Sequence, residues 1–180
     1  MNPSRNRHAS RGTNAVAGFT LLEVLITMFV IAVALLGTAG LQAYAMKVSQ
    51  SGQLRTEAVI LGLDLLERIE ANNPGAVAGN YVADPLPTVA PSDCYAVQCT
   101  PADIATYDLV QFGSLLGATL PSGAATVTRV AAGANLWTYT IQVNWVERTT
   151  RGSNTATTLG QTEAYSYTVS RTIYDQNATI

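Results

Sequence analysis

Charged residues are scarce in this sequence: they make up 12% of its 180 residues, against about 25% in an average protein. Three of the ten basic residues, Arg5, Arg7 and Arg11, precede the first acidic residue, Glu23. The other seven basic residues stand against twelve acidic ones, so the rest of the chain has a net charge of −5. A chain body with this balance lacks the basic surface that nucleic-acid binding requires.

Histidine occurs once, as His8, and cysteine only as Cys94 and Cys99. A structural zinc site takes four such ligands, and Ser-His-Asp catalysis needs a histidine that the folded part does not have. We therefore expect no metal, no cofactor and no enzymatic activity. If the domain is exported, the two cysteines are expected to form a disulfide that closes a short loop; two reduced, buried thiols are the alternative.

Long apolar runs are also rare, with one exception near the N-terminus. The 23 residues Phe19–Leu41 contain a single ionisable side chain, that of Glu23. As a helix this segment would be about 35 Å long, enough to cross a hydrocarbon core of about 30 Å. The arginines before it predict a cytoplasmic N-terminus and an exported remainder. Residues 1–18 then form a basic leader, and residues 19–41 the membrane-spanning half of a long helix.

The helical pattern continues beyond the membrane segment. Apolar residues recur at spacings of three and four, and the sequence "NNPG", at residues 72–75, supplies helix-terminating residues. This stripe consists of Leu54, Ala58, Leu61, Leu65 and Ile69. We therefore predict an amphipathic half of the same helix over residues 42–73. Residues 74–180 would form the globular head.

The head should combine one further helix with an antiparallel sheet. After an irregular loop over residues 75–92, Thr100 is a suitable N-cap, with Pro101 and Asp103 in the first turn of a helix that ends near Gly117. Three segments with alternating or β-prone residues then follow, at residues 125–130, 137–145 and 165–173, and they predict strands. The expected fold is α+β: a long N-terminal helix, half of it transmembrane, packed on a small antiparallel sheet. The polar stretch Thr149–Thr162 is expected to be an exposed loop.

Two other groups of side chains are candidates for a site. Asp64, Glu67 and Glu70 lie on the long helix, where a solvated helix face explains them better than a carboxylate site. The aromatic residues of the predicted strands could form a platform for sugars, but at strand spacing they are expected to be core. They are Trp137, Tyr139, Trp145, Tyr165 and Tyr167.

The hexapeptide "GFTLLE", Gly18–Glu23, follows a short basic leader and opens an apolar helix. In this it resembles the type IV prepilin signal. The resemblance implies that prepilin peptidase cleaves between Gly18 and Phe19, that Phe19 is then N-methylated, and that Glu23 forms an assembly charge pair.

The stretches "LLGTAGLQAYAMKVSQSGQLRTEAVILGLDLLERIEANNPGA", "CTPADIATYDLVQF" and "YTIQVNWVER" are similar to PilV-type minor pilins, the type IV pilus modification proteins. The resemblance implies a pilin fold and a non-catalytic subunit that primes or modifies pilus assembly, in twitching motility and adhesion. The implied partners are prepilin peptidase, other minor pilins, the major pilin and the inner-membrane assembly platform. The implied location is the inner membrane, with a periplasmic head, and then the pilus. Major pilins commonly have a helix-breaking proline where this chain has Gly40, one turn after Gly37.

Glu23 has a physical interpretation in this setting. Cleavage would create an α-amino group at Phe19, and in a bundle of helices this ammonium of one subunit could meet the Glu23 carboxylate of another. Losing one partner of a buried pair costs about 3–5 kcal/mol, so such a pair would select the correct register. Two simpler alternatives are an uncleaved signal anchor and a secretory signal that is cut after Ala34.

Two other functions remain open from the sequence. A pseudopilin of type II secretion would share the features up to Asn72, and deletion phenotypes would separate it from a pilus subunit. A pilus-tip adhesin, which belongs to a different class, would need an exposed binding loop, for which Thr149–Thr162 is the candidate.

Overall fold

The structure is a computed structural model that describes residues 18–91, 93–94, 96–148 and 162–178. Contacts divide the chain into two units, Met1–Met46 and Lys47–Ile180, and each is described by itself. The predicted loop Thr149–Thr162 lies outside the described residues, except for Thr162, which is the first residue of the last strand.

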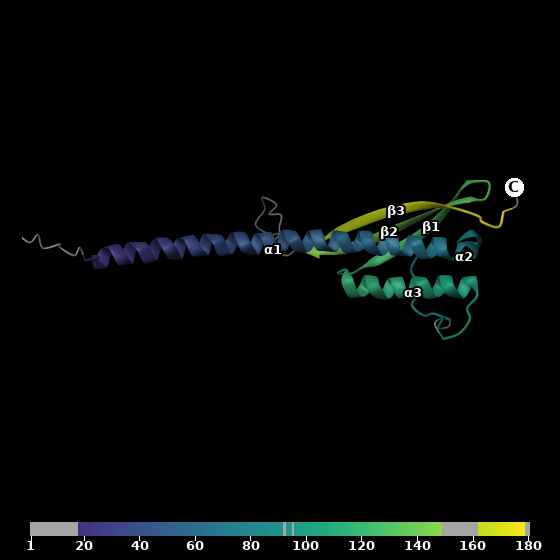
Figure 1. The fold of residues 1–180 in the computed structure, drawn as a ribbon, viewed down its shortest axis with the longest axis horizontal. Helices are drawn as coiled ribbons and strands as arrows, with labels where there is room; N and C mark the ends of the chain where they lie inside the picture. Colours follow the sequence, from purple (N-terminus) through teal and green to yellow (C-terminus); the bar gives the residue numbers. More distant parts are fainter. Residues whose placement is uncertain (1–17, 92, 95, 149–161, 179–180) are drawn as a thin grey trace, which may run out of the picture. The chain divides into compact units, whose positions relative to one another are not determined.

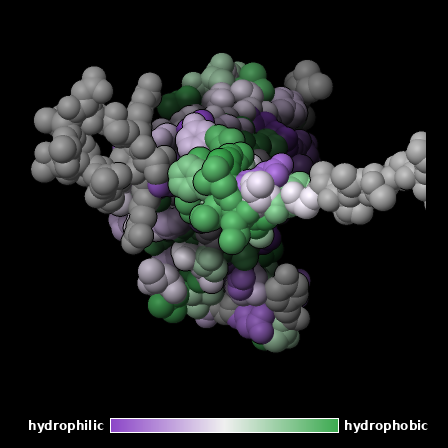
Figure 2. All heavy atoms as spheres, turned by 90° about the vertical axis from the view of Figure 1, so that its left-hand side faces the viewer, coloured by the Kyte–Doolittle hydropathy of each residue, from purple (hydrophilic) through white to green (hydrophobic). Residues whose placement is uncertain are grey.

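Helix α1, Leu21–Ala71, contributes to both units. In the first unit, the described side chains are exposed at every position up to Met46, and Figure 2 shows hydrophobic side chains gathered on this surface. Because apolar side chains in contact with water are unfavourable, this part of α1 requires an apolar surrounding such as lipid or other helices.

In the second unit, α1 buries one face in the core of the head. Its buried apolar residues are Ala58, Leu61, Leu65, Leu66 and Ile69, which follow the helical spacing of three and four. The predicted stripe is therefore the core-facing side, with Leu54 half-buried at its start. The helix ends at Ala71, as the sequence "NNPG" indicates.

A short helix that the sequence did not indicate, α2, spans Asn73–Ala78. The predicted irregular loop from Gly75 is therefore wrong for its first residues. Pro74 is compatible with α2 because proline in the first turn removes an N–H that has no helical partner. Its C-cap is Gly79, whose φ of 87° is the left-handed conformation that favours glycine.

Helix α3, Pro101–Thr119, starts as predicted. The Thr100 hydroxyl accepts a hydrogen bond from the Asp103 N–H at 3.2 Å, and the Asp103 carboxylate accepts one from the Thr100 N–H, also at 3.2 Å. This reciprocal capping box satisfies two N–H groups that have no partner within the helix. The helix runs two residues past the expected end near Gly117.

The three strands form one antiparallel sheet in the order β1–β2–β3 (Figure 1). They are β1, Ala124–Gly133, β2, Leu136–Arg148, and β3, Thr162–Tyr174. All three are longer than the predicted segments. The pairing of β2 with β3 is continuous from Leu136 opposite Tyr174 to Arg148 opposite Thr162.

The core lies between one face of this sheet and the helices. The buried strand residues are Ala125, Val127, Tyr139, Ile141, Val143, Trp145 and Ile173, which all have odd numbers and therefore share a face. From α3 the core receives Leu109, Phe112 and Leu116. The long N-terminal helix packed on a small antiparallel sheet confirms the predicted fold class.

Candidate processing and assembly site

The predicted cleavage site lies immediately before α1. Gly18, Phe19 and Thr20 are not helical, and α1 begins at Leu21. The Glu23 N–H donates to the Thr20 carbonyl at 3.1 Å and lies 3.3 Å from the Thr20 hydroxyl oxygen. Thr20 is therefore the N-cap, with Glu23 in the first turn, where a negative charge is favoured by the helix dipole. This position of Glu23 at the helix start was not predicted, although the spacing Thr-x-x-Glu is typical of a capping box.

Phe19, which precedes α1, lies close to Glu23 in the first turn of this helix. With Val24 and Thr27 they line a shallow hollow, in which Glu23 and Thr27, four residues apart, share one face of α1. Phe19 is 81% exposed, and Glu23 is exposed as well. Within the described part of the chain, the ion pairs of the structure do not include Glu23. The exposed segment Gly18–Phe19, which contains the predicted cleavage site, thus lies near the exposed carboxylate of Glu23.

The apolar part of α1 is long and apolar enough to cross a membrane. It remains helical through Gly37 and Gly40. A Cβ atom added at either glycine would meet no atom within 4 Å, so nothing within the described chain requires glycine there. Glycine weakens a helix by about 1 kcal/mol relative to alanine, and small residues permit close helix approach in membranes.

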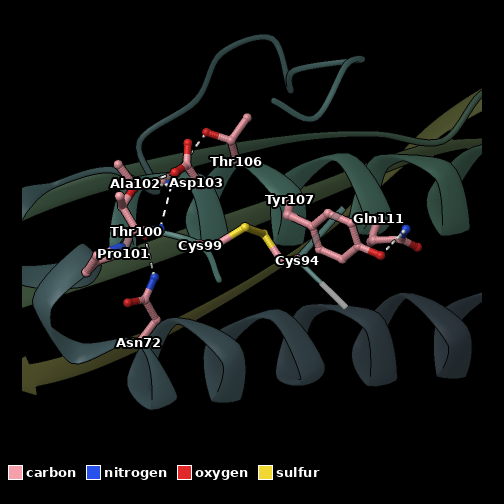
Figure 3. Close-up of a disulfide and its surroundings, with 10 residues drawn as sticks. All are labelled: Asn72, Cys94, Cys99, Thr100, Pro101, Ala102, Asp103, Thr106, Tyr107 and Gln111. Atoms are coloured by element: carbon pink, nitrogen blue, oxygen red, sulfur yellow. Dashed lines mark hydrogen bonds between the residues drawn. A yellow bond between two sulfur atoms is a disulfide. The ribbon is translucent and has the colours of Figure 1, made fainter. Parts of the chain in front are cut away.

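A disulfide joins Cys94 to Cys99 (Figure 3). It closes a loop directly before the N-cap of α3 at Thr100. The first turn of α3 is also held by Asn72, whose side-chain amide donates to the Pro101 carbonyl at 2.8 Å. The disulfide loop is thus attached to a helix end that is fixed by the capping box and by the end of α1.

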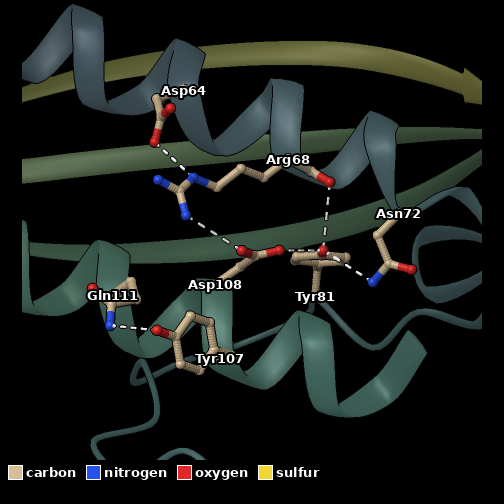
Figure 4. Close-up of polar contacts among 7 residues, drawn as sticks. All are labelled: Asp64, Arg68, Asn72, Tyr81, Tyr107, Asp108 and Gln111. Atoms are coloured by element: carbon tan, nitrogen blue, oxygen red, sulfur yellow. Dashed lines mark hydrogen bonds and ion pairs between the residues drawn. The ribbon is translucent and has the colours of Figure 1, made fainter. Parts of the chain in front are cut away.

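A buried polar cluster connects α1, α3 and the segment after α2 (Figure 4). The Tyr81 hydroxyl donates to the Asp108 carboxylate at 2.7 Å and accepts from the Asn72 amide at 3.1 Å. Arg68 lies 3.4 Å from the other Asp108 oxygen and 2.8 Å from Asp64. Burial raises the pKa of Tyr81, and the hydrogen bond to Asp108 raises it further. This cluster is structural, because its members satisfy one another and Tyr81 is fully buried.

The acidic residues of α1 are partly ion-paired. Asp64 pairs with Arg68, and Glu70 pairs with Arg171 of β3. The Asp64 and Glu70 side chains remain 44% and 54% exposed, as expected for a solvated face. The Glu70 pair also explains how Arg171 can lie on the apolar side of β3.

The predicted aromatic strand residues belong mainly to the core. Tyr139 and Trp145 are buried, while Trp137, Tyr165 and Tyr167 are partly buried and pack against the core. The rings of Trp145 and Tyr165 stack with centroids 6.0 Å apart. Within the described residues there is also no group of three or more side chains that could hold a metal ion.

Family comparisons give two adjacent matches. The prokaryotic N-terminal methylation motif matches residues 13–39, which include Gly18, Phe19 and Glu23. A family described as type IV pilin Tt1218 matches residues 40–110, which include the rest of α1, α2 and the first half of α3. No curated protein and no solved structure matches the chain significantly. Residues 13–39 therefore match an N-terminal methylation motif and residues 40–110 match a type IV pilin family, which together support a pilin subunit.

Proposed function

We propose that this chain is a minor pilin that primes or modifies the assembly of a type IV pilus. In this proposal prepilin peptidase cleaves between Gly18 and Phe19, and Phe19 is then N-methylated. The observation that carries the proposal is the methylation motif over residues 13–39, combined with an apolar helix that begins at Leu21, three residues after Gly18. Before cleavage, α1 would anchor the chain in the inner membrane with the head in the periplasm.

The role of Glu23 in this proposal is to pair with the ammonium group of Phe19 in another subunit. The exposure of both residues and their place in the same surface hollow support this role. In an apolar filament core an unpaired charge is costly, and loss of one partner of a buried pair costs about 3–5 kcal/mol. An uncleaved chain has no ammonium at Phe19, so assembly would depend on processing.

The test uses Glu23→Gln, which removes the charge but keeps the shape and the N-terminal position on α1. Glu67→Gln is the matched control, because it removes the same charge from the head half of α1. Mass spectrometry of the mature N-terminus should show cleavage before Phe19 and methylation of Phe19 in both variants. Recovery in sheared pili should fall at least tenfold for Glu23→Gln alone. Normal recovery of Glu23→Gln would refute the charge-pair role, and a mature N-terminus at Leu35 or no cleavage would refute the processing.

The remaining alternatives predict other phenotypes. A subunit of the pilus should be needed for twitching motility, whereas a pseudopilin of type II secretion should be needed for the release of exoproteins. A deletion strain examined for both properties distinguishes them. A pull-down from membranes of cells without the major pilin would identify the other minor pilins that contact this chain before polymerisation.

A further inference from the structure

The residues that follow β3 contain an acceptor motif for N-linked glycosylation. The sequence Asn177-Ala178-Thr179 has the form Asn-x-Thr, in which x is not proline. Asn2 is the one other asparagine that precedes a serine or threonine by two positions, but Pro3 follows it and it lies in the predicted leader. Asn177 is therefore the single position in the head that the motif allows.

Asn177 lies in an exposed turn shortly after the end of β3 (Figure 1). Its backbone N–H donates to the Asp175 carboxylate at 2.9 Å, and the Ala178 N–H donates to the Asp175 carbonyl at 3.2 Å. The side-chain amide of Asn177 forms no hydrogen bond within the described part of the chain. Asp175 thus shapes the turn, and the side-chain amide that would receive a sugar is not engaged in the fold.

The head holds this segment only as far as Gln176. The Asp175 N–H donates to the Asn135 carbonyl at 2.9 Å, and the Gln176 N–H donates to the side-chain oxygen of Asn73 at 3.2 Å. From Asn177 onward, the hydrogen bonds of the described residues are those within the turn. An enzyme that breaks these two local bonds can therefore draw Asn177 into an extended conformation without unfolding the sheet.

The spacing of the motif has a physical reason. In extended backbone, side chains two positions apart point to the same side. A single enzyme pocket can then hold the asparagine amide together with the hydroxyl two residues later. In that conformation the Thr179 hydroxyl can form a hydrogen bond with the Asn177 amide that reacts.

We propose that Asn177 is N-glycosylated by an oligosaccharyltransferase, with an oligosaccharide linked to a polyprenyl pyrophosphate as the donor. The bond between C1 of the first sugar and the pyrophosphate oxygen breaks, and C1 forms a new bond to Nδ2 of Asn177. The amide loses one proton and the lipid pyrophosphate leaves, so no group is oxidised or reduced. This inference rests on the export of the head that is part of the proposed function, because this motif is modified in exported proteins. A bulky, hydrophilic glycan would keep this end of the head in solvent.

The test is mass spectrometry of the chain purified from the membranes of its own cells. Its mass should exceed that of the processed polypeptide by one oligosaccharide. Trypsin, which cleaves after Arg171, releases residues 172–180 as one peptide that contains Asn177. Fragmentation of this peptide by electron transfer should place the added mass on Asn177.

Three variants separate the acceptor amide from the hydroxyl of the motif. Asn177→Gln removes the acceptor but keeps an exposed amide. Thr179→Val removes the hydroxyl and keeps the size of the side chain, whereas Thr179→Ser keeps the hydroxyl. We expect Asn177→Gln to carry no glycan, Thr179→Val to lower the glycosylated fraction at least tenfold, and Thr179→Ser to lower it less than threefold.

The state of the cysteines distinguishes failure of this inference from failure of export. Alkylation before and after reduction shows whether the Cys94–Cys99 disulfide has formed, as it does in an oxidising compartment. An unmodified Asn177 in a chain that contains the disulfide would overturn the inference and leave export intact. A glycan that persists in Asn177→Gln or in Thr179→Val would overturn it as well.

A chain with free thiols would show that export has failed, and a reaction in vitro then decides about the site. The purified chain in detergent is mixed with a purified oligosaccharyltransferase and a polyprenyl-pyrophosphate oligosaccharide. Transfer to the wild type but not to Asn177→Gln would support the assignment of Asn177. Absence of transfer to the wild type would overturn it.

Discussion

Removal of the Tyr81 hydroxyl is the sharpest test of the forces that hold the head together. In Tyr81→Phe the ring stays in its fully buried position, while the 2.7 Å hydrogen bond to Asp108 and the 3.1 Å bond from Asn72 are lost. The Asn72 amide retains the Pro101 carbonyl as a partner. The Asp108 carboxylate keeps Arg68 at 3.4 Å but loses its closest neutral donor.

The expected loss of stability in Tyr81→Phe comes mainly from the hydrogen bond to Asp108. Hydrogen bonds to charged groups contribute about 1.5–3 kcal/mol to stability. We therefore expect the free energy of unfolding of Tyr81→Phe to be about 2–3 kcal/mol lower than that of the wild type at pH 7. In a protein of this size each kcal/mol lowers the Tm by about 2–4 °C, so the Tm should fall by about 4–12 °C. In a double variant with Asp108→Ala the loss should be smaller than the sum of the single losses, because both substitutions break the same contact.

The pH dependence gives an independent check with a definite sign. The pKa of Tyr81 is raised in the folded chain by burial and by Asp108, whereas in the unfolded chain it is about 10. Above pH 10 the unfolded state loses this proton and the folded state keeps it, so wild-type stability falls by about 1.4 kcal/mol per pH unit from this group. Tyr81→Phe lacks this titrating group. The stability difference between the wild type and Tyr81→Phe should therefore be constant below pH 10 and should shrink above it.

The assay is thermal unfolding of the full chain in detergent, followed by circular dichroism between pH 7 and pH 11. Tyr165→Phe is the matched control, because the Tyr165 hydroxyl also donates to a carboxylate, that of Glu163 at 2.9 Å, but this hydrogen bond is exposed to solvent. This control should change the Tm little, since exposed pairs are weak. A Tm loss of less than 2 °C for Tyr81→Phe, or a loss that persists unchanged at pH 11, would refute the reasoning.

Two further predictions concern the backbone and the disulfide. Gly79→Ala should destabilise the chain by about 1–2 kcal/mol, because Gly79 has a φ of 87° and its added Cβ would lie 3.0 Å from Arg129. Gly117→Ala, at a helical position with open space, should be neutral or stabilising, and equal Tm values for the two variants would contradict this account. Replacing Cys94 and Cys99 together by serine should cost about 2 kcal/mol from the lost closure of a short loop. Unfolding of the wild type with and without reductant should show the same difference, and an unchanged Tm would show that the disulfide does not stabilise the head.

Several features could be predicted because they depend on residues close together in the chain. The Thr100 N-cap of α3 and the alternation in β2 are of this kind. Helix α2 could not be predicted, since Asn73–Ala78 is too short for periodicity and contains poor helix formers. It is held by distant groups instead: the Arg129 guanidinium and the Tyr139 hydroxyl donate to the Ala76 carbonyl at 3.0 and 2.6 Å.

The sequence by itself determined the order of α1, α3 and the three strands and the membrane-compatible start of α1, because apolar periodicity and helix caps act over a few neighbouring residues. The segment Gly18–Glu23 is identified by its resemblance to the type IV prepilin signal, which consists of consecutive residues. Only the tertiary structure decided that Asp108 and Tyr81, 27 residues apart, share a buried hydrogen bond with each other. It also decided that β3 lies at an edge, since strand order depends on which chain segments pack together. Hydrogen bonds between distant residues leave no periodic signal in a single sequence, so the cohesion of the head and its open edge appear only in the folded chain.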